Sequence, residues 1–293
     1  MSVLNEFLQQ LVSGIAVGCV YALVALGFVL IYKATDVVNF AHGEVMMIGA
    51  FLGLTFITKL QFPYFAGVAA AVVCMTVFGA VLNRFLLRPL AGQGILAIIV
   101  VTLGLSILLR AFASVVWGPE TFALESPFSR KVVHLGELVL SQEHVAIIVI
   151  TAIMVLGLYL FFRLSRVGIA MQATSENQLA AYYVGIPVKK IHSLIWALGA
   201  ATAGIAGIMV APISFVHVNM GAIGLKAFPA AVLGGFGSIP GAIVGGVIIG
   251  VVESMSVLYL PEGINTVSAY VLLLFMLIVR PQGLFGIQSK RRV

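Results

Sequence analysis

The sequence has 293 residues, of which 61% are hydrophobic and only 9% are charged, and its mean hydropathy is +1.16. Because soluble domains carry about a quarter charged residues, this composition excludes a soluble globular protein and predicts a chain embedded in membrane lipid. The formal net charge of +6 does not indicate nucleic-acid binding, because the basic residues stand at the ends of apolar runs and not in one patch.

The chain begins with a long uncharged segment, residues 7–32, which we expect to cross the membrane. No basic stretch precedes it, and it is longer than the core of a cleavable signal peptide, so we expect it to be retained. A polar interval follows. The next uncharged segment, residues 45–58, is short for a full crossing, which takes about 20 residues.

Three further spans are predicted before residue 163. They are residues 60–83, residues 89–109 with an extension to Trp117, and residues 145–162. Between the last two, residues 118–143 form the longest polar interval and carry charges of both signs. We expect this interval to lie outside the membrane on the outward side.

In the second half, the uncharged run 227–252 is interrupted by prolines and glycines, so we divide it into a short segment and a full span. The predicted segments of this half are 193–216, 222–236, 239–259 and 263–279, followed by the basic tail 280–293. The fold predicted is therefore an all-α polytopic membrane protein, one domain over residues 1–293. It has about eight or nine transmembrane segments, some of them short or re-entrant.

Glycines four residues apart recur in several of these segments. Such pairs let two helix backbones approach closely within a membrane, so each pair predicts a packing face. The pairs are Gly14/Gly18, Gly49/Gly53, Gly241/Gly245 and Gly246/Gly250.

The distribution of basic residues predicts the orientation of the spans. If the loop 163–192 and the C-terminal tail both lie in the cytoplasm, four crossings must separate them, and four are available. The N-terminus then lies outside. Of the 16 Lys and Arg residues, eleven fall on the cytoplasmic side, as the positive-inside rule requires. These are the basic residues at positions 33, 84, 88, 163, 166, 189, 190, 280, 290, 291 and 292.

One short segment differs from the rest because helix-ending residues bound it on both sides. Ser175 is a predicted N-cap, and Gln178 three residues later completes a capping box. Gly185 is placed for the left-handed position after the helix, and Pro187 prevents its continuation. The apolar, aromatic body predicts a helix that docks into a partner and couples it to the spans. The predicted coupling residues are Ser175, Glu176, Asn177, Gln178, Leu179, Ala180, Ala181, Tyr182, Tyr183 and Gly185.

Two helix-breaking intervals, one in each half of the chain, each adjoin a short apolar segment. Paired interruptions of this kind indicate a translocation path built on an inverted repeat, because broken helices expose backbone groups that lipid cannot satisfy. The alternative is that both are ordinary polar loops at the membrane surface. The candidate path residues are Asn39, Phe40, His42, Gly43, Gly234, Gly235, Phe236, Gly237 and Ser238.

Four charged residues stand in or beside apolar runs: Glu44, Arg110, Lys226 and Glu253. Charges at such positions usually face a cavity or a partner. For Lys226 and Glu253 we expect instead that the side chains extend to the lipid headgroups. His42 is expected to be a hydrogen-bonding group and not a proton relay.

No catalytic site is indicated. The phosphate-binding motif GxxxxGK[ST] is absent, so the chain is not expected to hydrolyse nucleotides itself. The five histidines are scattered, and Cys19 and Cys74 both lie in apolar segments, so neither a metal site nor a disulfide is predicted. We expect a chain that is not an enzyme and binds no cofactor.

The coupling segment resembles the cytoplasmic loop of ABC-importer permeases, in which Glu-Ala-Ala is followed after three residues by Gly. Ala180, Ala181 and Gly185 hold this pattern, with the acidic residue displaced to Glu176. Five stretches spread over nearly the whole chain are similar to the H-type permease subunits of high-affinity leucine/isoleucine/valine importers. They are Tyr21–Phe28, Val38–Glu44, Gly168–Asn177, Ala230–Ala242 and Arg280–Gly286.

This resemblance implies a permease subunit of an ATP-binding-cassette importer that moves branched-chain amino acids across the bacterial inner membrane. The partners implied are a homologous second permease subunit, two cytoplasmic ATPase subunits that bind ATP and Mg, and a periplasmic or extracytoplasmic substrate-binding protein. Membrane lipid surrounds the complex.

Three other functions stay open. A similar permease can carry urea, short amides or other amino acids. A secondary transporter driven by an ion gradient is a second alternative, which paired intramembrane carboxylates with ion ligands would favour. The third is a membrane scaffold or receptor that transports nothing, and the broken helices argue against it.

Overall fold

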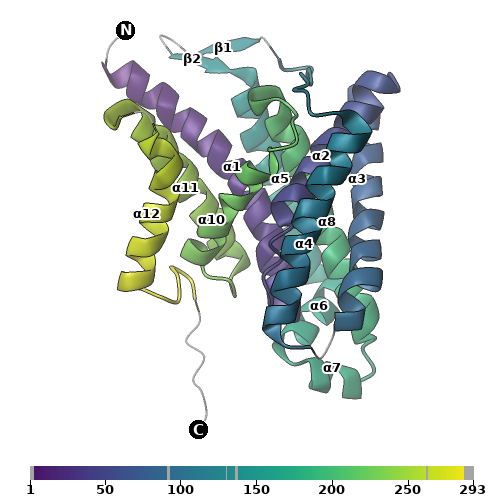
Figure 1. Ribbon diagram of the computed structural model, residues 1–293. Coiled ribbons are helices and arrows are strands. Elements are labelled where there is room, and N and C mark those ends of the chain that lie inside the picture. Colours follow the sequence, from purple (N-terminus) through teal and green to yellow (C-terminus); the bar gives the residue numbers. More distant parts are fainter. Residues whose placement is uncertain (1–2, 91–92, 130, 136–137, 262, 287–293) are drawn as a thin grey trace.

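The computed structural model describes residues 3–90, 93–129, 131–135, 138–261 and 263–286. These residues form a bundle of helices that run mostly along one direction (Figure 1). The long helices are α1 (Val3–Thr35), α3 (Tyr64–Leu82), α4 (Ile95–Trp117), α5 (Gln142–Leu164), α8 (Val188–Ser214) and α11 (Ile239–Tyr259). The predicted basic residues Lys290, Arg291 and Arg292 lie outside the described residues.

Shorter elements connect or interrupt the long ones. The short helices are α2 (His42–Leu54), α6 (Arg166–Glu176), α7 (Gln178–Tyr183), α9 (Gly221–Leu225), α10 (Ala227–Gly234) and α12 (Ile264–Val279). Helix α2 continues as a π-helical turn, Thr55–Lys59, and α3 as the π-helical turn Asn83–Leu87 and the 3₁₀ turn Arg88–Leu90. Strands β1 (Val132–Leu135) and β2 (Leu138–Ser141) pair as an antiparallel ribbon in the long polar interval.

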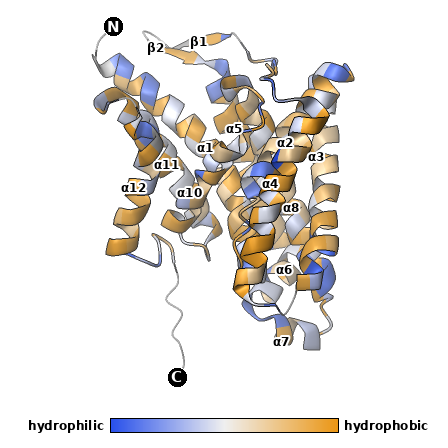
Figure 2. Cartoon of the chain, in the orientation of Figure 1, coloured by the Kyte–Doolittle hydropathy of each residue, from blue (hydrophilic) through white to orange (hydrophobic). Residues whose placement is uncertain are grey.

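Six helices of the described chain are long and apolar enough to cross a membrane, and shorter apolar helices accompany them. The prediction of a polytopic all-α membrane protein is therefore confirmed. Helices α1 and α8 lie in the centre and are mostly buried, whereas α3, α4 and α5 expose most of their apolar side chains. Figure 2 shows these outer helices as largely hydrophobic along their length, as lipid contact requires.

The glycine pairs pack as predicted. A Cβ atom added to Gly18 would lie 2.7 Å from Cα of Val247, and one added to Gly250 would lie 2.3 Å from Cα of Gly18. Helices α1 and α11 therefore meet backbone to backbone. A Cβ on Gly49 of α2 would likewise lie 2.3 Å from Cα of Gly204 in α8. Substitution by any larger residue at these positions forces the helices apart.

Contacts between helix ends agree with the predicted sidedness. At the start of α7, the Gln178 amide donates to the carbonyl of Ala34 at the end of α1 (2.9 Å). In the turn after α3, Arg88 donates to the carbonyl of Lys189 at the start of α8 (2.7 Å). Figure 1 shows α6 and α7 at one end of the molecule, with the N-terminal end of α1 and the β1–β2 ribbon at the other.

Three predicted segments differ in their bounds. The span predicted over 60–83 begins at Tyr64, because Pro63 has no amide hydrogen and precedes the first helical turn. The span predicted over 89–109 begins only at Ile95. The short segment 222–236 is two helices, α9 and α10, that meet at Lys226.

Candidate coupling and translocation sites

The predicted docking segment is shorter than expected, and its N-cap was assigned wrongly. Ser175 lies inside α6, two residues before the start of the next helix, and its hydroxyl donates to the carbonyl of Met171 (2.9 Å). The N-cap residue of α7 is Asn177. Its backbone is extended, and its side-chain oxygen accepts from the amide of Ala180 (2.9 Å). Gln178 forms no capping box, because its side chain bonds to α1.

The end of α7 has the predicted geometry. Gly185 adopts the left-handed conformation, with φ of +85°. Its amide donates to the carbonyl of Tyr182, and the amide of Ile186 donates to the carbonyl of Ala181, both at 3.0 Å. These two bonds form a Schellman motif. Helix α7 is therefore held at both ends by its own chain.

The side chains of α7 divide into a buried and an exposed set. Ala181 is buried against the protein and only 3% exposed, so it anchors the helix and does not belong to the surface available for docking. Leu179 is 70% exposed and Tyr183 is 82% exposed, and Tyr182 and Val184 are exposed as well. We call these four residues, Leu179, Tyr182, Tyr183 and Val184, the α7 patch. A patch this apolar at a helix end indicates an interaction surface.

The first interrupted segment re-enters the bundle. After α1 ends at Thr35, the chain runs without regular structure to Ala41, and α2 begins at His42. The His42 ring contacts Phe28, in the interior of α1, with 4.7 Å between ring centroids. Gly27 leaves the room for this ring, since a Cβ there would lie 2.2 Å from Nε2 of His42. Helix α2 therefore starts within the bundle and not at its surface.

The His42 side chain lies inside the bundle, against α1. The side chain is 1% exposed, and its hydrogen-bonding neighbour is the backbone of Val24 in α1. The ring packs as an aromatic group against Phe28.

The second interrupted segment reaches the first through aromatic contacts. Phe228 of α10 lies 6.0 Å from Phe40 and 6.2 Å from Phe28, measured between ring centroids. It also contacts Phe236 (5.7 Å), which in turn contacts Tyr32 (4.6 Å). We call these five residues the aromatic cluster. The sequence offered no signal for Phe28, Tyr32 or Phe228, which are ordinary aromatics of apolar runs.

The backbones of the two segments also touch. A Cβ atom on Gly43, at the start of α2, would lie 2.2 Å from the carbonyl oxygen of Gly221 in α9. The turn after α10 is held by glycine as well, since Gly235 has φ of +98°. Ser238 then caps α11 by accepting from the amide of Gly241 (3.1 Å). The two breaks form one continuous region and are not separate surface loops.

The nine candidate path residues do not share one cavity. Asn39 lines a cavity of about 560 Å³ near α7. Gly237 and Ser238 line a second cavity of about 1020 Å³, between α5, α6 and the start of α11. Phe40 and Phe236 belong to the aromatic cluster and line neither cavity.

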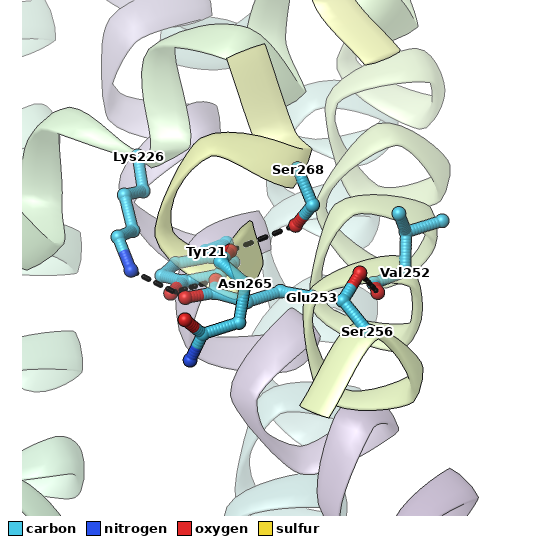
Figure 3. A network of polar contacts seen from close by, with 7 residues as sticks. All are labelled: Tyr21, Lys226, Val252, Glu253, Ser256, Asn265 and Ser268. Atoms are coloured by element: carbon cyan, nitrogen blue, oxygen red, sulfur yellow. Dashed lines mark hydrogen bonds and ion pairs between the residues drawn. The ribbon is translucent and has the colours of Figure 1, made fainter. Parts of the chain in front are cut away.

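The four isolated charges form two ion pairs. Arg110 of α4 donates to Glu44 of α2 (2.6 Å), and the Glu44 side chain is fully buried. Lys226, between α9 and α10, pairs with Glu253 of α11, which also accepts from the Tyr21 hydroxyl (2.6 Å; Figure 3). The expectation that Lys226 and Glu253 extend to the headgroups is wrong, because each neutralises the other inside the bundle.

Comparisons with known proteins agree with this architecture. The family model described as "Branched-chain amino acid transport system / permease component" matches residues 10–280. The chain is 34% identical to the high-affinity branched-chain amino acid transport system permease protein LivH of Escherichia coli K12, over 96% of each chain. It is also 34% identical to the corresponding protein BraD of Pseudomonas aeruginosa, over 98% of each chain.

A more distant relative and one solved structure extend the comparison. The probable branched-chain amino acid transport permease protein LivH of Methanocaldococcus jannaschii is 27% identical over 92% of this chain and 89% of that protein. The structure of PsaBC from Streptococcus pneumoniae in complex with Fab has 16% identity and a TM-score of 0.52, covering 94% of this chain and 91% of that one. At this identity the likeness concerns the fold alone.

Proposed function

The chain belongs to the family of branched-chain amino acid transport permeases, and we propose that it works as the membrane subunit of an ATP-driven importer for these amino acids. In this proposal a homologous second permease completes the pore. Two cytoplasmic ATPase subunits hold ATP and Mg, and an extracytoplasmic binding protein delivers the substrate. The chain lies in the bacterial inner membrane and itself binds no cofactor.

The observation that carries the proposal is the α7 patch. Leu179, Tyr182, Tyr183 and Val184 stand exposed on a helix of six residues that is capped at both ends. A helix this short is unstable in isolation, so its surroundings hold it in place. An apolar helix surface presented in this way suits a groove on an ATPase subunit. Most of the basic residues that the structure describes lie at this same end, as they should at a cytoplasmic end.

Contacts within the chain supply a route from the α7 patch to the interrupted segments. Gln178 connects α7 to Ala34 in the last turn of α1. The residues that follow α1 lead directly to Asn39 and Phe40, and Phe40 contacts Phe228 of the second segment. In the proposed cycle, displacement of α7 by the ATPases shifts the end of α1 and repacks the aromatic cluster. Nucleotide state then biases the bundle between two arrangements.

The direct test is uptake of labelled leucine into proteoliposomes that hold the whole complex. We expect uptake to require ATP and the binding protein, and to be competed by isoleucine and valine. Uptake of another solute under the same requirements would contradict the substrate and keep the coupling. Uptake driven by an ion gradient without the ATPases would overturn the proposal.

The docking role is tested by replacing Tyr182 and Tyr183 together with Ala. Both side chains are exposed, so the fold should persist while the ATPases no longer co-purify with the complex. Tyr259→Ala is the matched control, because Tyr259 is also exposed but ends α11, far from α7. Equal recovery of the ATPases with both variants would contradict docking through the α7 patch.

A further inference from the structure

The larger of the two cavities described above, about 1020 Å³ in volume, lies between α5 and the start of α11. Both helices pack against α1, and Cys19 of α1 lines the cavity between them. One wall comes from α5, over the range Ile148 to Arg163, and the opposite wall includes Ile239 and Ile243 of α11. We call this cavity the α5 groove.

The α5 groove is long enough to hold a lipid chain. From Ile148 to Arg163 the axis of α5 rises by about 22 Å, whereas the hydrocarbon of one membrane leaflet is about 15 Å deep. The lining residues of α5 recur three or four positions apart, so they occupy one face of the helix. Most of them are apolar: Ile148, Ala152, Val155, Leu156 and Phe162.

Two basic residues line the end of the α5 groove at which α1 and α5 terminate. Lys33 stands in the last turn of α1, and Arg163 stands in the last turn of α5. Arg163 is exposed, and its guanidinium donates to the hydroxyl of Tyr159 (2.6 Å), which lines the same wall. None of the described residues that line the groove is acidic. The groove is therefore positively charged at one end and apolar along most of its length.

This distribution of charge distinguishes between classes of ligand. A free amino acid carries an ammonium group, and no carboxylate of the lining is present to receive it. A small soluble anion uses the two cations but leaves the apolar walls uncovered. An anionic phospholipid satisfies both parts, because its phosphate accepts hydrogen bonds from Lys and Arg while its chain covers the walls. Basic pockets between membrane helices on the cytoplasmic side are typical sites for such headgroups.

We propose that the α5 groove binds an anionic phospholipid of the cytoplasmic leaflet, with its phosphate at Lys33 and Arg163 and one acyl chain between α5 and α11. The choice of leaflet rests on the orientation in the proposed function, whereas lipid binding itself does not depend on transport. Ile169 and Gln172 of α6 also line the groove, and α6 leads through Asn177 directly into α7. The bound lipid therefore steadies the helix that carries the α7 patch.

Native mass spectrometry of the whole complex in detergent measures which lipid is retained when phosphatidylglycerol and phosphatidylethanolamine are added in equal amounts. We expect phosphatidylglycerol to be retained in preference and to resist an excess of inorganic phosphate. Displacement by phosphate would assign the two cations to a soluble anion. Retention by the isolated chain but not by the complex would assign the groove to the contact with the second permease. Either result, or equal retention of the two lipids, overturns the proposal.

The headgroup site is tested with the double variant Lys33→Gln/Arg163→Gln. Each basic residue beside an anionic headgroup contributes about fivefold to affinity, so retention of phosphatidylglycerol should fall roughly 25-fold. Arg84→Gln/Arg166→Gln is the matched control, because it removes the same charge at the same end of the molecule, and both residues are exposed and line neither cavity. Equal retention by the two double variants would refute the headgroup site.

The acyl chain is tested with Ala152→Trp, which fills the α5 groove and leaves both cations in place. Phosphatidylglycerol should then be lost, whereas Ala111→Trp on the exposed face of α4 should retain it. Phosphatidylglycerol should also slow hydrogen exchange of the α6 amides in the original complex but not in Ala152→Trp. Unchanged retention in Ala152→Trp, or exchange that the lipid does not slow, would contradict the proposal. Neither measurement requires transport, so such a failure leaves the proposed function standing.

Discussion

The two interrupted segments each carry one charged residue that forms an ion pair with a neighbouring helix. The sign of this charge is negative in the first segment and positive in the second. In the first segment an acid, Glu44, stands in the opening turn of α2 and is paired with a base on the outer helix α4. In the second a base, Lys226, separates α9 from α10 and is paired with an acid on the central helix α11.

The pairs also differ in how well each charge is satisfied. Glu44 is fully buried, and its second carboxylate oxygen has no partner within the described chain. Arg110, its partner, is 44% exposed among apolar side chains of α4. Glu253, in contrast, has both oxygens bonded, one by Lys226 and one by Tyr21. The first pair therefore depends on a single contact, and the second is a network that tolerates a loss.

The largest effect is expected from Arg110→Met. The change leaves the Glu44 carboxylate buried without a cation, which should cost about 3–5 kcal/mol of stability. Thermal unfolding in detergent measures this loss. The double variant Glu44→Gln/Arg110→Met removes the stranded charge and should recover much of the stability. A double variant no more stable than the single one would show that the pair is not the cause.

A smaller loss is expected from Lys226→Met. Glu253 keeps the hydrogen bond from Tyr21 and the pair is only partly buried, so the cost should be about 2–3 kcal/mol, below that of a fully buried charge left alone. The same unfolding assay compares it with Arg110→Met. If Lys226→Met proves the more damaging of the two, the distinction between a single contact and a network is wrong.

The contact that joins the two segments is tested by Gly43→Ala. The added Cβ would lie 2.2 Å from the carbonyl oxygen of Gly221, so α2 and α9 must separate, at a cost of about 1–3 kcal/mol. Leucine uptake should fall together with the melting temperature. Gly104→Ala on α4 is the matched control, since nothing lies within 4 Å of that Cβ. Equal behaviour of the two variants would contradict close packing at Gly43.

The smallest effect is expected from Tyr21→Phe. It removes one hydrogen bond to a charged group while Lys226 still neutralises Glu253, so about 1.5 kcal/mol should be lost. Combined with Lys226→Met, however, it should cost more than the sum of the two single changes, because Glu253 then has neither partner. Strict additivity in the double-mutant cycle would argue against a network.

The features that sequence reasoning found are those that depend on local chemistry. Spacing alone indicated that Gly18 and Gly250 line packing faces, and the structure joins these very positions. Gly185 followed by Pro187 marked the end of α7 in the same way, because few residues other than glycine adopt a positive φ without cost.

The features that sequence reasoning missed depend on which residues, far apart in the chain, come into contact in the fold. Ser175 has a side chain suited to an N-cap, but α6 extends through this residue, and its hydroxyl donates to the carbonyl of Met171 within that helix. Glu44 and Arg110 were each noticed as costly charges, yet nothing in the sequence shows that α2 packs against α4. The cavity near α7 was missed for the same reason, since Asn39, Arg88 and Trp196 come from three separate parts of the chain.

The close backbone contact between α1 and α11 determines when the helix bundle can assemble during synthesis. Helix α1 is made first, and its glycine face has no partner until α11 emerges about 230 residues later. At about 5–20 residues per second, α1 waits in the membrane for roughly 10–50 seconds before the bundle can close. Chains that stop before α11 leave the first helix without its main contact, and we expect them to be degraded.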